Sequence, residues 1–253
     1  WPNHSSVFGI IDLASLPKDR YYLYRSQWNK QSPTLHILPH WNWKGREGKV
    51  TPVMVYTSYP KAELFINGKS KGIKEKADPS PLDYTATANT PYWERDRVAD
   101  EASKNDKQAM GRYRLVWEDA VYEPGEVKVI AYDKSGMPVD EAKVVTAGKA
   151  HHVVLTSNRT IINADGNDLV YVTVQIADKQ GNILPDNDSM VDFKVSGAAE
   201  FLATANGDPT CLMSFYEPRM KLFSGAATVI LRAASTPGTA TLTVAAPGVK
   251  PAK

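Results

Sequence analysis

The sequence predicts a mainly β protein in which two consecutive β-sandwiches follow a short loop and helix. Three observations support this fold class. Helical periodicity is confined to the first 28 residues, whereas residues 34–148 alternate apolar and polar side chains with the period of two that strands have. A second run of alternating segments begins near residue 149. Short strands separated by turn residues at close intervals are typical of a sandwich.

Composition and charge limit the classes of function. At 253 residues the chain fits two modules of about 100 residues each. A net charge of +2, from 30 basic and 28 acidic residues, gives no reason to expect a nucleic acid or a membrane surface as partner. No apolar run approaches the roughly 18 residues of a membrane-spanning helix. Cys211 is the single cysteine, so we expect no internal disulfide and no cysteine-based zinc site.

The first elements of the chain are a loop and one helix. Pro17 suits the first helical turn, because its missing N–H costs nothing there. Tyr21, Tyr24 and Trp28 recur at the spacing of one helical face. A single helix cannot bury such an aromatic stripe by itself. We therefore expect residues 1–31 to be the end of a larger domain that lies upstream and covers the stripe.

The first predicted sandwich comprises residues 32–148. Its strongest local signal is Asn67-Gly68, which lies between two apolar runs and predicts a tight hairpin, since both central residues need a positive φ. Residues 74–108 form a long polar stretch with little periodicity. Stretches of this kind inside a compact domain are usually functional or mobile loops.

The second predicted sandwich comprises residues 149–253. Its clearest strand is 169–177, in which every second side chain is valine or isoleucine. The turn at 178–181 (Asp-Lys-Gln-Gly) repeats the chemistry of the turn at 133–136 (Asp-Lys-Ser-Gly) in the first sandwich. This repetition indicates two modules of related architecture, although the same turn chemistry can also arise independently.

Several segments, taken in order along the chain, carry a more specific signal: Phe8-Gly-Ile-Ile-Asp-Leu-Ala14, Pro17-Lys-Asp-Arg-Tyr-Tyr-Leu-Tyr24, Gln27-Trp28, Leu38-Pro-His-Trp-Asn-Trp43, Glu63-Leu-Phe-Ile-Asn-Gly-Lys69, Tyr122-Glu-Pro-Gly-Glu-Val127, Ala164-Asp-Gly-Asn-Asp-Leu-Val-Tyr-Val-Thr-Val174 and Asn206-Gly-Asp-Pro-Thr210. Together they resemble the C-terminal portion of bacterial glycoside hydrolase family two enzymes, in particular the β-galactosidase-like members of the Bacteroides type. The chain departs from the family at His4, where arginine is frequent, and at Ser15, where glycine is usual.

The resemblance implies that residues 1–31 are the last loop and helix of a catalytic TIM barrel and that both sandwiches are immunoglobulin-like. It also implies a parent enzyme that hydrolyses β-galactosides or similar β-glycosides with retention of configuration. Retention needs two carboxyl groups about 5–5.5 Å apart. In the family both are glutamates on barrel strands upstream of the opening segment, and no glutamate of this chain matches either motif. We therefore expect no catalytic residue here and no activity from this chain alone.

The resemblance also implies partners and a location. The partners are the chain's own upstream barrel, a β-glycoside or polysaccharide substrate bound through the parent enzyme, and a second copy in a homo-oligomer. No cofactor is implied. The implied location is the bacterial periplasm or the cell exterior. The preferred glycoside and linkage stay open, because the pockets that select them lie upstream.

Trp1 and His4 are candidates for contact with the substrate. They belong to the loop that would follow the last barrel strand, at the face where barrel active sites form. A tryptophan there could stack on a sugar ring, and a histidine could hydrogen-bond to a hydroxyl group. The more common outcome is that both residues fix the loop against the barrel, because aromatic side chains bury a large area.

Two aromatic pairs are candidates for a sugar platform or an interface. Trp41 and Trp43 alternate with polar residues, which predicts a strand with both indoles on one side. Packing against the barrel or inside the sandwich core is the more frequent fate of such a pair. Tyr92 and Trp93 lie in the long polar stretch, which points equally to a partner surface or to a small cluster beneath the loop.

Two stretches gather oxygen ligands, at residues 165–168 and 186–188. Calcium needs six to eight oxygens, and neither stretch offers the full loop pattern. Turns closed by Asx side chains explain both, so we expect no metal site. The two histidines at 151–152 lie at the junction of the modules, where we expect a solvated linker.

Two further functions stay open from the sequence. Residues 150–245 look like a bacterial immunoglobulin-like module, which would suit a carbohydrate-binding or cell-surface adhesion role. A purely structural interaction protein would explain why no nucleophile is paired with a base. Fold alone does not separate these functions.

Overall fold

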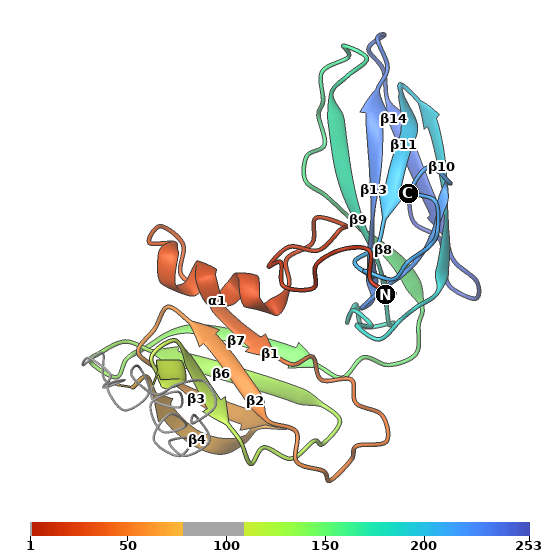
Figure 1. The fold of residues 1–253 in the computed structure, drawn as a ribbon. Helices are drawn as coiled ribbons and strands as arrows, with labels where there is room; N and C mark the ends of the chain where they lie inside the picture. Colours follow the sequence, from red (N-terminus) through yellow and green to blue (C-terminus); the bar gives the residue numbers. More distant parts are fainter. Residues whose placement is uncertain (1, 78–108) are drawn as a thin grey trace, which may run out of the picture. The chain divides into compact units, whose positions relative to one another are not determined.

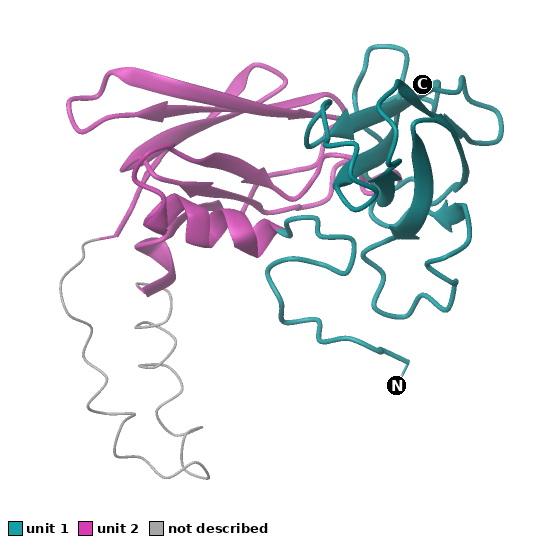
Figure 2. Cartoon of the chain, turned by 90° about the horizontal axis from the view of Figure 1, so that it is seen from above, with its two compact units in different colours: residues 1–18, 146–253 teal, residues 19–145 magenta. Residues whose placement is uncertain are grey.

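The computed structural model describes residues 2–77 and 109–253, and this part of the chain is mainly β (Figure 1). The chain divides into two compact units, residues 19–145 and residues 146–253 together with 1–18 (Figure 2). Each unit contains two antiparallel sheets. The predicted fold class, mainly β with two sandwiches, is confirmed.

The division into units splits the opening segment. Residues up to Lys18 belong to the compact unit of the second sandwich, whereas the helix α1 (Asp19–Trp28) belongs to that of the first. The assignment of residues 1–31 to the end of a barrel stays a prediction, as do the predicted domain boundaries at 32 and 149.

The first sandwich packs a three-stranded sheet against a four-stranded one. In spatial order the sheets are β1 (Leu35–Leu38), β2 (Val53–Thr57) and β5 (Arg114–Trp117), and β4 (Lys69–Glu75), β3 (Lys61–Ile66), β6 (Glu126–Tyr132) and β7 (Pro138–Val145). Alternate residues of both sheets meet in one core, in which Val55, Leu64 and Val129 are fully buried. The period of two in the sequence therefore corresponds to one buried face on each sheet.

The hairpin between β3 and β4 is the one that the sequence predicts. Asn67 and Gly68 both have positive φ, at 49° and 76°. The Asn67 amide also joins the next turn, because its Nδ2 donates to the Pro124 carbonyl oxygen at 3.2 Å and its Oδ1 accepts from the Glu126 N–H at 2.8 Å. One side chain thus fixes the spacing of two neighbouring loops.

The predicted strand around Trp41 and Trp43 is wrong. The chain leaves β1 at Leu38 and is irregular until it pairs at Val50. The Trp41 indole donates from Nε1 to the Glu123 carbonyl oxygen at 2.8 Å. A loop that turns back over the end of the core can bury this large ring, which a strand continuing outward could not do.

Helix α1 packs on the first sandwich through a face that the sequence did not single out. The Tyr22 ring stacks on the His36 imidazole with centroids 3.9 Å apart, and the buried Ser26 accepts through its carbonyl oxygen from the Ser58 hydroxyl. Tyr24 and Trp28 stack on each other at 4.7 Å and remain 36% and 72% exposed. The two downstream sandwiches therefore do not shelter the predicted aromatic stripe.

The second sandwich contains the other seven strands. Its sheets, in spatial order, are β12 (Arg219–Lys221), β10 (Met190–Gly197) and β14 (Ala240–Ala245), and β11 (Ala199–Ala205), β13 (Ala226–Ala233), β9 (Leu169–Ala177) and β8 (His152–Ser157). The clearest predicted strand corresponds to β9, and its alternate side chains enter the core. Across the described residues, no helix is long and apolar enough to cross a membrane.

The two Asp-x-x-Gly turns have the same geometry. Gly136 and Gly181 have φ of 92° and 90°, and each donates its N–H to the carbonyl oxygen of the aspartate three residues earlier. Each aspartate carboxylate then accepts the N–H of the residue after the glycine, at 3.0 Å from Met137 and 2.9 Å from Asn182. The two modules therefore share this turn.

Asp178 differs from its counterpart because it is buried. Its carboxylate also accepts the backbone N–H groups of Gly148 and Gln180 and the side-chain amide of Asn182. Burial opposes ionisation of this carboxyl group, but the hydrogen bonds to its charged form outweigh burial and lower its pKa to about 2. Asp178 thereby ties the first residues of the second sandwich to the end of β9.

We predict that Asp178→Ala lowers the free energy of unfolding of the second sandwich by about 2–4 kcal/mol, because several backbone and amide donors lose a shared acceptor. Urea denaturation measures the loss. Asp133→Ala is the matched control, since Asp133 closes the same turn but is half-exposed. It should cost about 1 kcal/mol or less. Equal losses would contradict the importance of burial.

The pH dependence of stability should follow from the lowered pKa of Asp178. The stabilisation is fully present above the unfolded-state pKa of about 3.9 and is lost as the pH falls toward the folded-state pKa of about 2. Asp178→Asn cannot ionise, so its unfolding free energy should change less between pH 4 and pH 2 than that of the natural chain. Urea denaturation measures the unfolding free energy of both proteins at each pH. An equal change for the two proteins between pH 4 and pH 2 would refute the prediction.

Candidate functional site

The opening loop, residues 2–18, is shaped by one aspartate. The Asp12 carboxylate accepts the backbone N–H groups of Ala14 and Leu16, both at 2.9 Å. The Asp12 N–H donates to the Leu16 carbonyl oxygen at 3.0 Å. Ser15 lies inside this tight turn with φ of 61°. That left-handed conformation favours glycine, which gives a physical reason for the glycine usual in the family at this position.

The second sandwich binds this loop through a buried hydroxyl group. Thr228 lies on β13, and its Oγ1 donates to the Ala14 carbonyl oxygen at 2.7 Å. Both residues are almost fully buried, with 4% and 3% of their surface exposed. A buried carbonyl group needs a donor, so the loop and the sheet satisfy each other here. Figure 1 shows the opening loop running beside β8 and β9.

A loop of the same sandwich, residues 206–213, also contacts the opening loop. The His4 N–H donates to the Pro209 carbonyl oxygen at 2.9 Å. Gly207 is buried against Asp12 so closely that a Cβ at position 207 would lie 2.2 Å from the Asp12 Oδ2 atom. Only glycine permits this approach. The Asn206 side chain secures the loop in turn, because its Nδ2 donates to the Lys221 carbonyl oxygen at 2.8 Å.

His4 lies beside a shallow cavity of about 340 Å³ that the opening loop and the 206–213 loop form together. His4 is exposed, and its neighbours in the lining are mostly apolar, among them Leu13, Met213 and Phe215. Trp1, the other predicted substrate-proximal residue, lies outside the described residues. The structure thus places His4 at a fixed point of the loop, and its role toward a substrate stays a prediction.

The predicted aromatic pairs do not form one site. Trp41 is 1% exposed, and its ring meets that of Tyr122 edge to face at 5.1 Å, so it fills the core rather than presenting a sugar platform. Trp43 is half-buried and stacks on His40 at 4.4 Å. Tyr92 and Trp93 lie outside the described residues, as does most of the 74–108 stretch.

The acidic stretches form turns. The Asp165 carboxylate accepts the N–H groups of Asn167 and Asp168, both at 2.8 Å, and Asn187 accepts that of Ser189 at 3.0 Å. Residues 165–168 and 186–188 therefore close Asx turns, as expected. Among the described residues, no three His, Cys, Asp or Glu side chains are grouped to hold a metal ion.

The histidine pair at the module junction is not a solvated linker. His151 and His152 are both half-buried, with their Nδ1 atoms 3.1 Å apart, and His152 begins β8. Burial, followed by the charge of Lys250, lowers the pKa of His151. The linker expectation fails because the chain enters the sheet directly at this point.

The sequence did not single out Asp12, Gly207 or Thr228 as residues that hold the opening loop. Asn206-Gly-Asp-Pro-Thr210 was noted for its resemblance alone, without a contact. A signal for the Asp12 turn was present, because an aspartate three residues before a glycine-preferring position favours an Asx turn. Nothing local could have shown that this turn meets a loop almost 200 residues further along the chain.

Comparison with known proteins identifies the family. Residues 153–253 match the family model described as glycoside hydrolase family 2 C-terminal domain 5. The chain is 37% identical over its full length to a β-galactosidase of Bacteroides ovatus, and it covers a quarter of that protein's length. This chain belongs to the C-terminal region of glycoside hydrolase family 2. Residues 48–140 of this family 2 chain match a model described only as a domain of unknown function.

Solved structures agree with this membership. The chain aligns over its full length with 28% of a β-glycosidase from Bacteroides vulgatus, at a TM-score of 0.81 and 30% identity. It aligns over 98% of its length with 31% of a family 2 member from Bacteroides cellulosilyticus, at a TM-score of 0.76 and 28% identity. A putative β-glucuronidase of Formosa agariphila is 29% identical over 94% of the chain. The chain spans a fifth to a quarter of the length of these curated relatives.

We predict that Gly207→Ala forces the opening loop away from the 206–213 loop. The added methyl group would overlap the Asp12 carboxylate, so the free energy of unfolding should fall by about 1–3 kcal/mol. The amide protons of Ala14 and Leu16 should exchange faster with solvent. Gly148→Ala is the control, because a Cβ there meets its nearest neighbour at an ordinary 3.5 Å. Hydrogen exchange at the opening loop that is equal in both variants would contradict the described contact.

Proposed function

We propose that this chain is the non-catalytic C-terminal region of a retaining β-glycosidase, β-galactosidase-like in specificity, and that its second sandwich holds the loop beside the active site. The observation that carries the proposal is the binding of the opening loop by the second sandwich at His4 and Ala14. The family resemblance assigns this loop to the barrel face where the substrate binds. A loop at that face must be held rigidly to position any side chain toward a sugar.

The holding contacts are suited to this role because they act on the backbone. The bond from the His4 N–H to Pro209 fixes the path of the loop whatever the side chain at position 4 does. The Thr228 hydroxyl group and the Asp12 turn fix the path ten residues further on. In the parent enzyme, Trp1 and His4 would therefore be presented from a rigid support rather than from a free loop.

Helix α1 supplies the second part of the proposal. Its Tyr22 and Ser26 face packs on the first sandwich, while Tyr24 and Trp28 stay exposed on another face. The two rings stack on each other into one exposed apolar patch, and contiguous apolar patches often mark a partner surface. We propose that the upstream barrel covers them, so that α1 is shared between the barrel and the first sandwich.

The substrate class follows the relatives. The β-galactosidase of Bacteroides ovatus is more similar to this chain than the β-glucuronidases of Formosa agariphila are. We therefore propose a β-galactoside in preference to a β-glucuronide. The periplasm or cell exterior and a homo-oligomeric parent are proposed on the resemblance alone.

A carbohydrate-binding module is the competing function, and the described residues do not favour it. Trp41 is withdrawn into the core. A cavity of about 790 Å³ in the second sandwich is lined mainly by aliphatic and threonine side chains together with Ser157, Arg159 and Lys253, and its lining contains no aromatic ring. Sugar-binding surfaces depend on aromatic stacking, so this alternative has no structural support here.

We expect the 253-residue chain to show no turnover of a chromogenic β-galactoside, and the parent enzyme to show clear turnover under the same conditions. The physical reason is that the two carboxyl groups of a retaining mechanism belong to the upstream barrel. A chromogenic β-glucuronide run in parallel tests the substrate class. Turnover by the chain alone, or an inactive but folded parent, would disprove the assignment.

The holding role is tested in the parent enzyme with the same glycine pair. Gly207→Ala should lower kcat/KM by about 10-fold or more, because misplacement of active-site groups by about 1 Å can cost up to 100-fold. Gly148→Ala should leave kcat/KM within about twofold. If both variants keep full activity while hydrogen exchange shows that Gly207→Ala has loosened the opening loop, the loop is not part of the active site.

The shared helix is tested by Trp28→Ala in two settings. In the 253-residue chain Trp28 is 72% exposed, so its removal should change the free energy of unfolding by less than about 0.5 kcal/mol. In the parent enzyme the same change should cost about 3–5 kcal/mol, as for other buried aromatic rings. Thermal unfolding of all four proteins decides the matter, and an equal effect in both settings would mean that no barrel covers this face.

A further inference from the structure

The cavity of about 340 Å³ beside His4 is lined mostly by apolar side chains. Its polar members are His4 and Ser5 of the opening loop. The remaining lining residues are Leu13, Cys211, Leu212, Met213 and Phe215. The cysteine belongs with them because a thiol behaves as a small apolar group. Cavities that take small ligands have volumes of about 300–1,000 Å³, so this cavity is large enough for a small organic group.

The second sandwich fixes one wall of this cavity. Cys211, Met213 and Phe215 pack against the hydrophobic core of the sandwich. The Phe215 carbonyl oxygen also accepts the N–H of Thr204 in β11 at 2.8 Å, which ties this wall to the sheet. The wall is therefore already formed without a ligand, and a ligand that binds there does not have to order it.

The rim of the cavity exposes two large aliphatic side chains. Leu13 is 44% exposed and Leu212 is 79% exposed. Leu13 is held at the rim by its neighbours, because Asp12 closes the turn around it and Ala14 accepts the hydrogen bond from Thr228. Apolar side chains that gather at an exposed hollow indicate a surface for an apolar partner.

The lining favours an aromatic or alkyl group over a sugar ring. The hydroxyl groups of a sugar would give up water there and find only His4 and Ser5 among the lining side chains, which is unfavourable. An apolar group has no such cost, and it removes apolar surface of Leu13 and Leu212 from water. The ligand that suits this cavity is therefore apolar.

We propose that this cavity binds the aglycone of the substrate and that this aglycone is an apolar aryl or alkyl group. The inference rests on the proposed function, because it needs the opening loop to face the substrate of the parent enzyme. The barrel would hold the galactosyl unit, and the group on the other side of the glycosidic oxygen would reach the cavity. The aglycone is favoured over a side chain of the barrel because the cavity borders on His4, in the loop that the resemblance assigns to the substrate side.

The test uses the parent enzyme and two galactosides whose leaving groups are both alcohols, 2-phenylethyl β-galactoside and lactose. Leu212→Asn replaces an apolar rim side chain by a polar one of similar size. We expect this change to lower kcat/KM for the phenylethyl substrate by about fivefold or more, mainly through KM, because an apolar contact with the aglycone is lost. For lactose, kcat/KM should change by less than about twofold.

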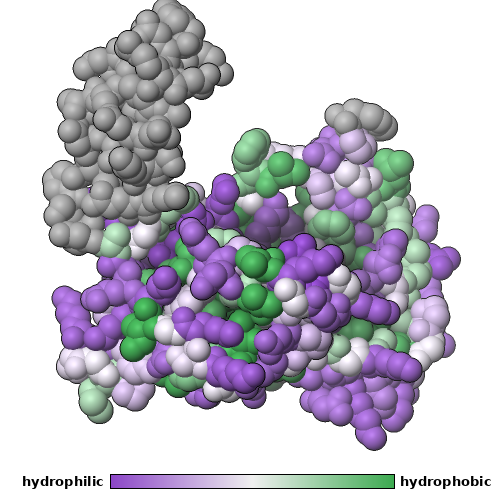
Figure 3. All heavy atoms as spheres, turned by 90° about the horizontal axis from the view of Figure 1, so that it is seen from below, coloured by the Kyte–Doolittle hydropathy of each residue, from purple (hydrophilic) through white to green (hydrophobic). Residues whose placement is uncertain are grey.

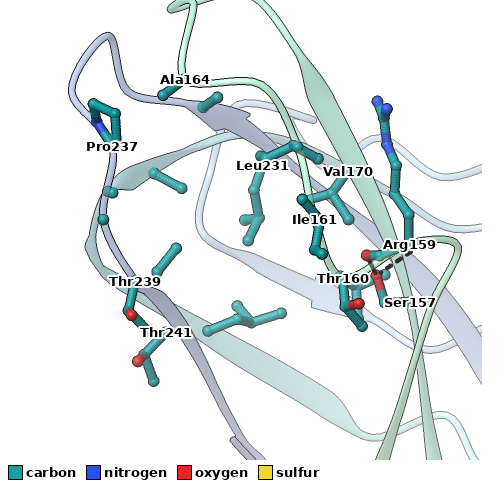
Figure 4. A pocket seen from close by; sticks show the side chains of 18 of the residues that line it. Ser157, Arg159, Thr160, Ile161, Ala164, Val170, Leu231, Pro237, Thr239 and Thr241 are labelled. Atoms are coloured by element: carbon teal, nitrogen blue, oxygen red, sulfur yellow. Dashed lines mark hydrogen bonds between the residues drawn. The ribbon is translucent and has the colours of Figure 1, made fainter.

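Ile161→Asn is the matched control. Ile161 is also an exposed aliphatic residue of the second sandwich, at 86%, and it lines a different cavity, which Figure 4 shows. This variant should leave kcat/KM for both substrates within about twofold.

Two results would overturn the inference. An equal loss of kcat/KM for both substrates would show that Leu212 does not discriminate between aglycones. An unchanged kcat/KM for both would show that the aglycone does not reach the cavity, and a lowered Tm of the same variant would then identify the barrel as the occupant.

A parallel assay with 2-phenylethyl β-glucuronide separates this inference from the proposed function. If the parent hydrolyses the glucuronide in place of the galactosides, the proposed sugar is wrong. A loss of about fivefold or more with Leu212→Asn on the glucuronide would still support the aglycone site, and an unchanged kcat/KM would refute it.

Discussion

The close approach of Asp12 to Gly207 is the contact on which the position of the opening loop depends most directly. The Asp12 carboxylate closes its own turn, and the missing side chain at position 207 lets that turn lie against the second sandwich. The Thr228 hydroxyl group then binds the carbonyl oxygen that the turn presents. The bond from the His4 N–H to the Pro209 carbonyl oxygen holds the same loop at a second point. The loop is the part of the chain that the family resemblance places nearest to the substrate.

Aspartate carboxylates accept backbone N–H groups at several turns of this chain. Asp12, Asp133, Asp165 and Asp178 each close a loop in this way. With a single cysteine, the chain has no internal disulfide to fix its loops. A charged acceptor shortens and strengthens such bonds, so each aspartate gives a loop a definite shape at little cost in chain length. Asp178, which is buried, also ties two segments together.

Among the described residues, apolar side chains are exposed on the Tyr24 and Trp28 face of α1 and line the open side of the second sandwich between β8 and β14. Figure 3 shows apolar residues interspersed among polar ones on the visible face. The helix face is the surface that the proposed upstream barrel would cover.

The sequence by itself determined the features that depend on neighbouring residues. These were the two-residue period of the strands, the Asn67-Gly68 hairpin, the paired Asp-x-x-Gly turns and the family resemblance. Tertiary structure decided where Trp41 is buried, which face α1 uses, and that Asp12 meets Gly207. These outcomes depend on contacts between residues far apart in the chain, and a local pattern carries no record of such partners. A tryptophan in a polar context looks the same whether a distant loop covers it or leaves it exposed.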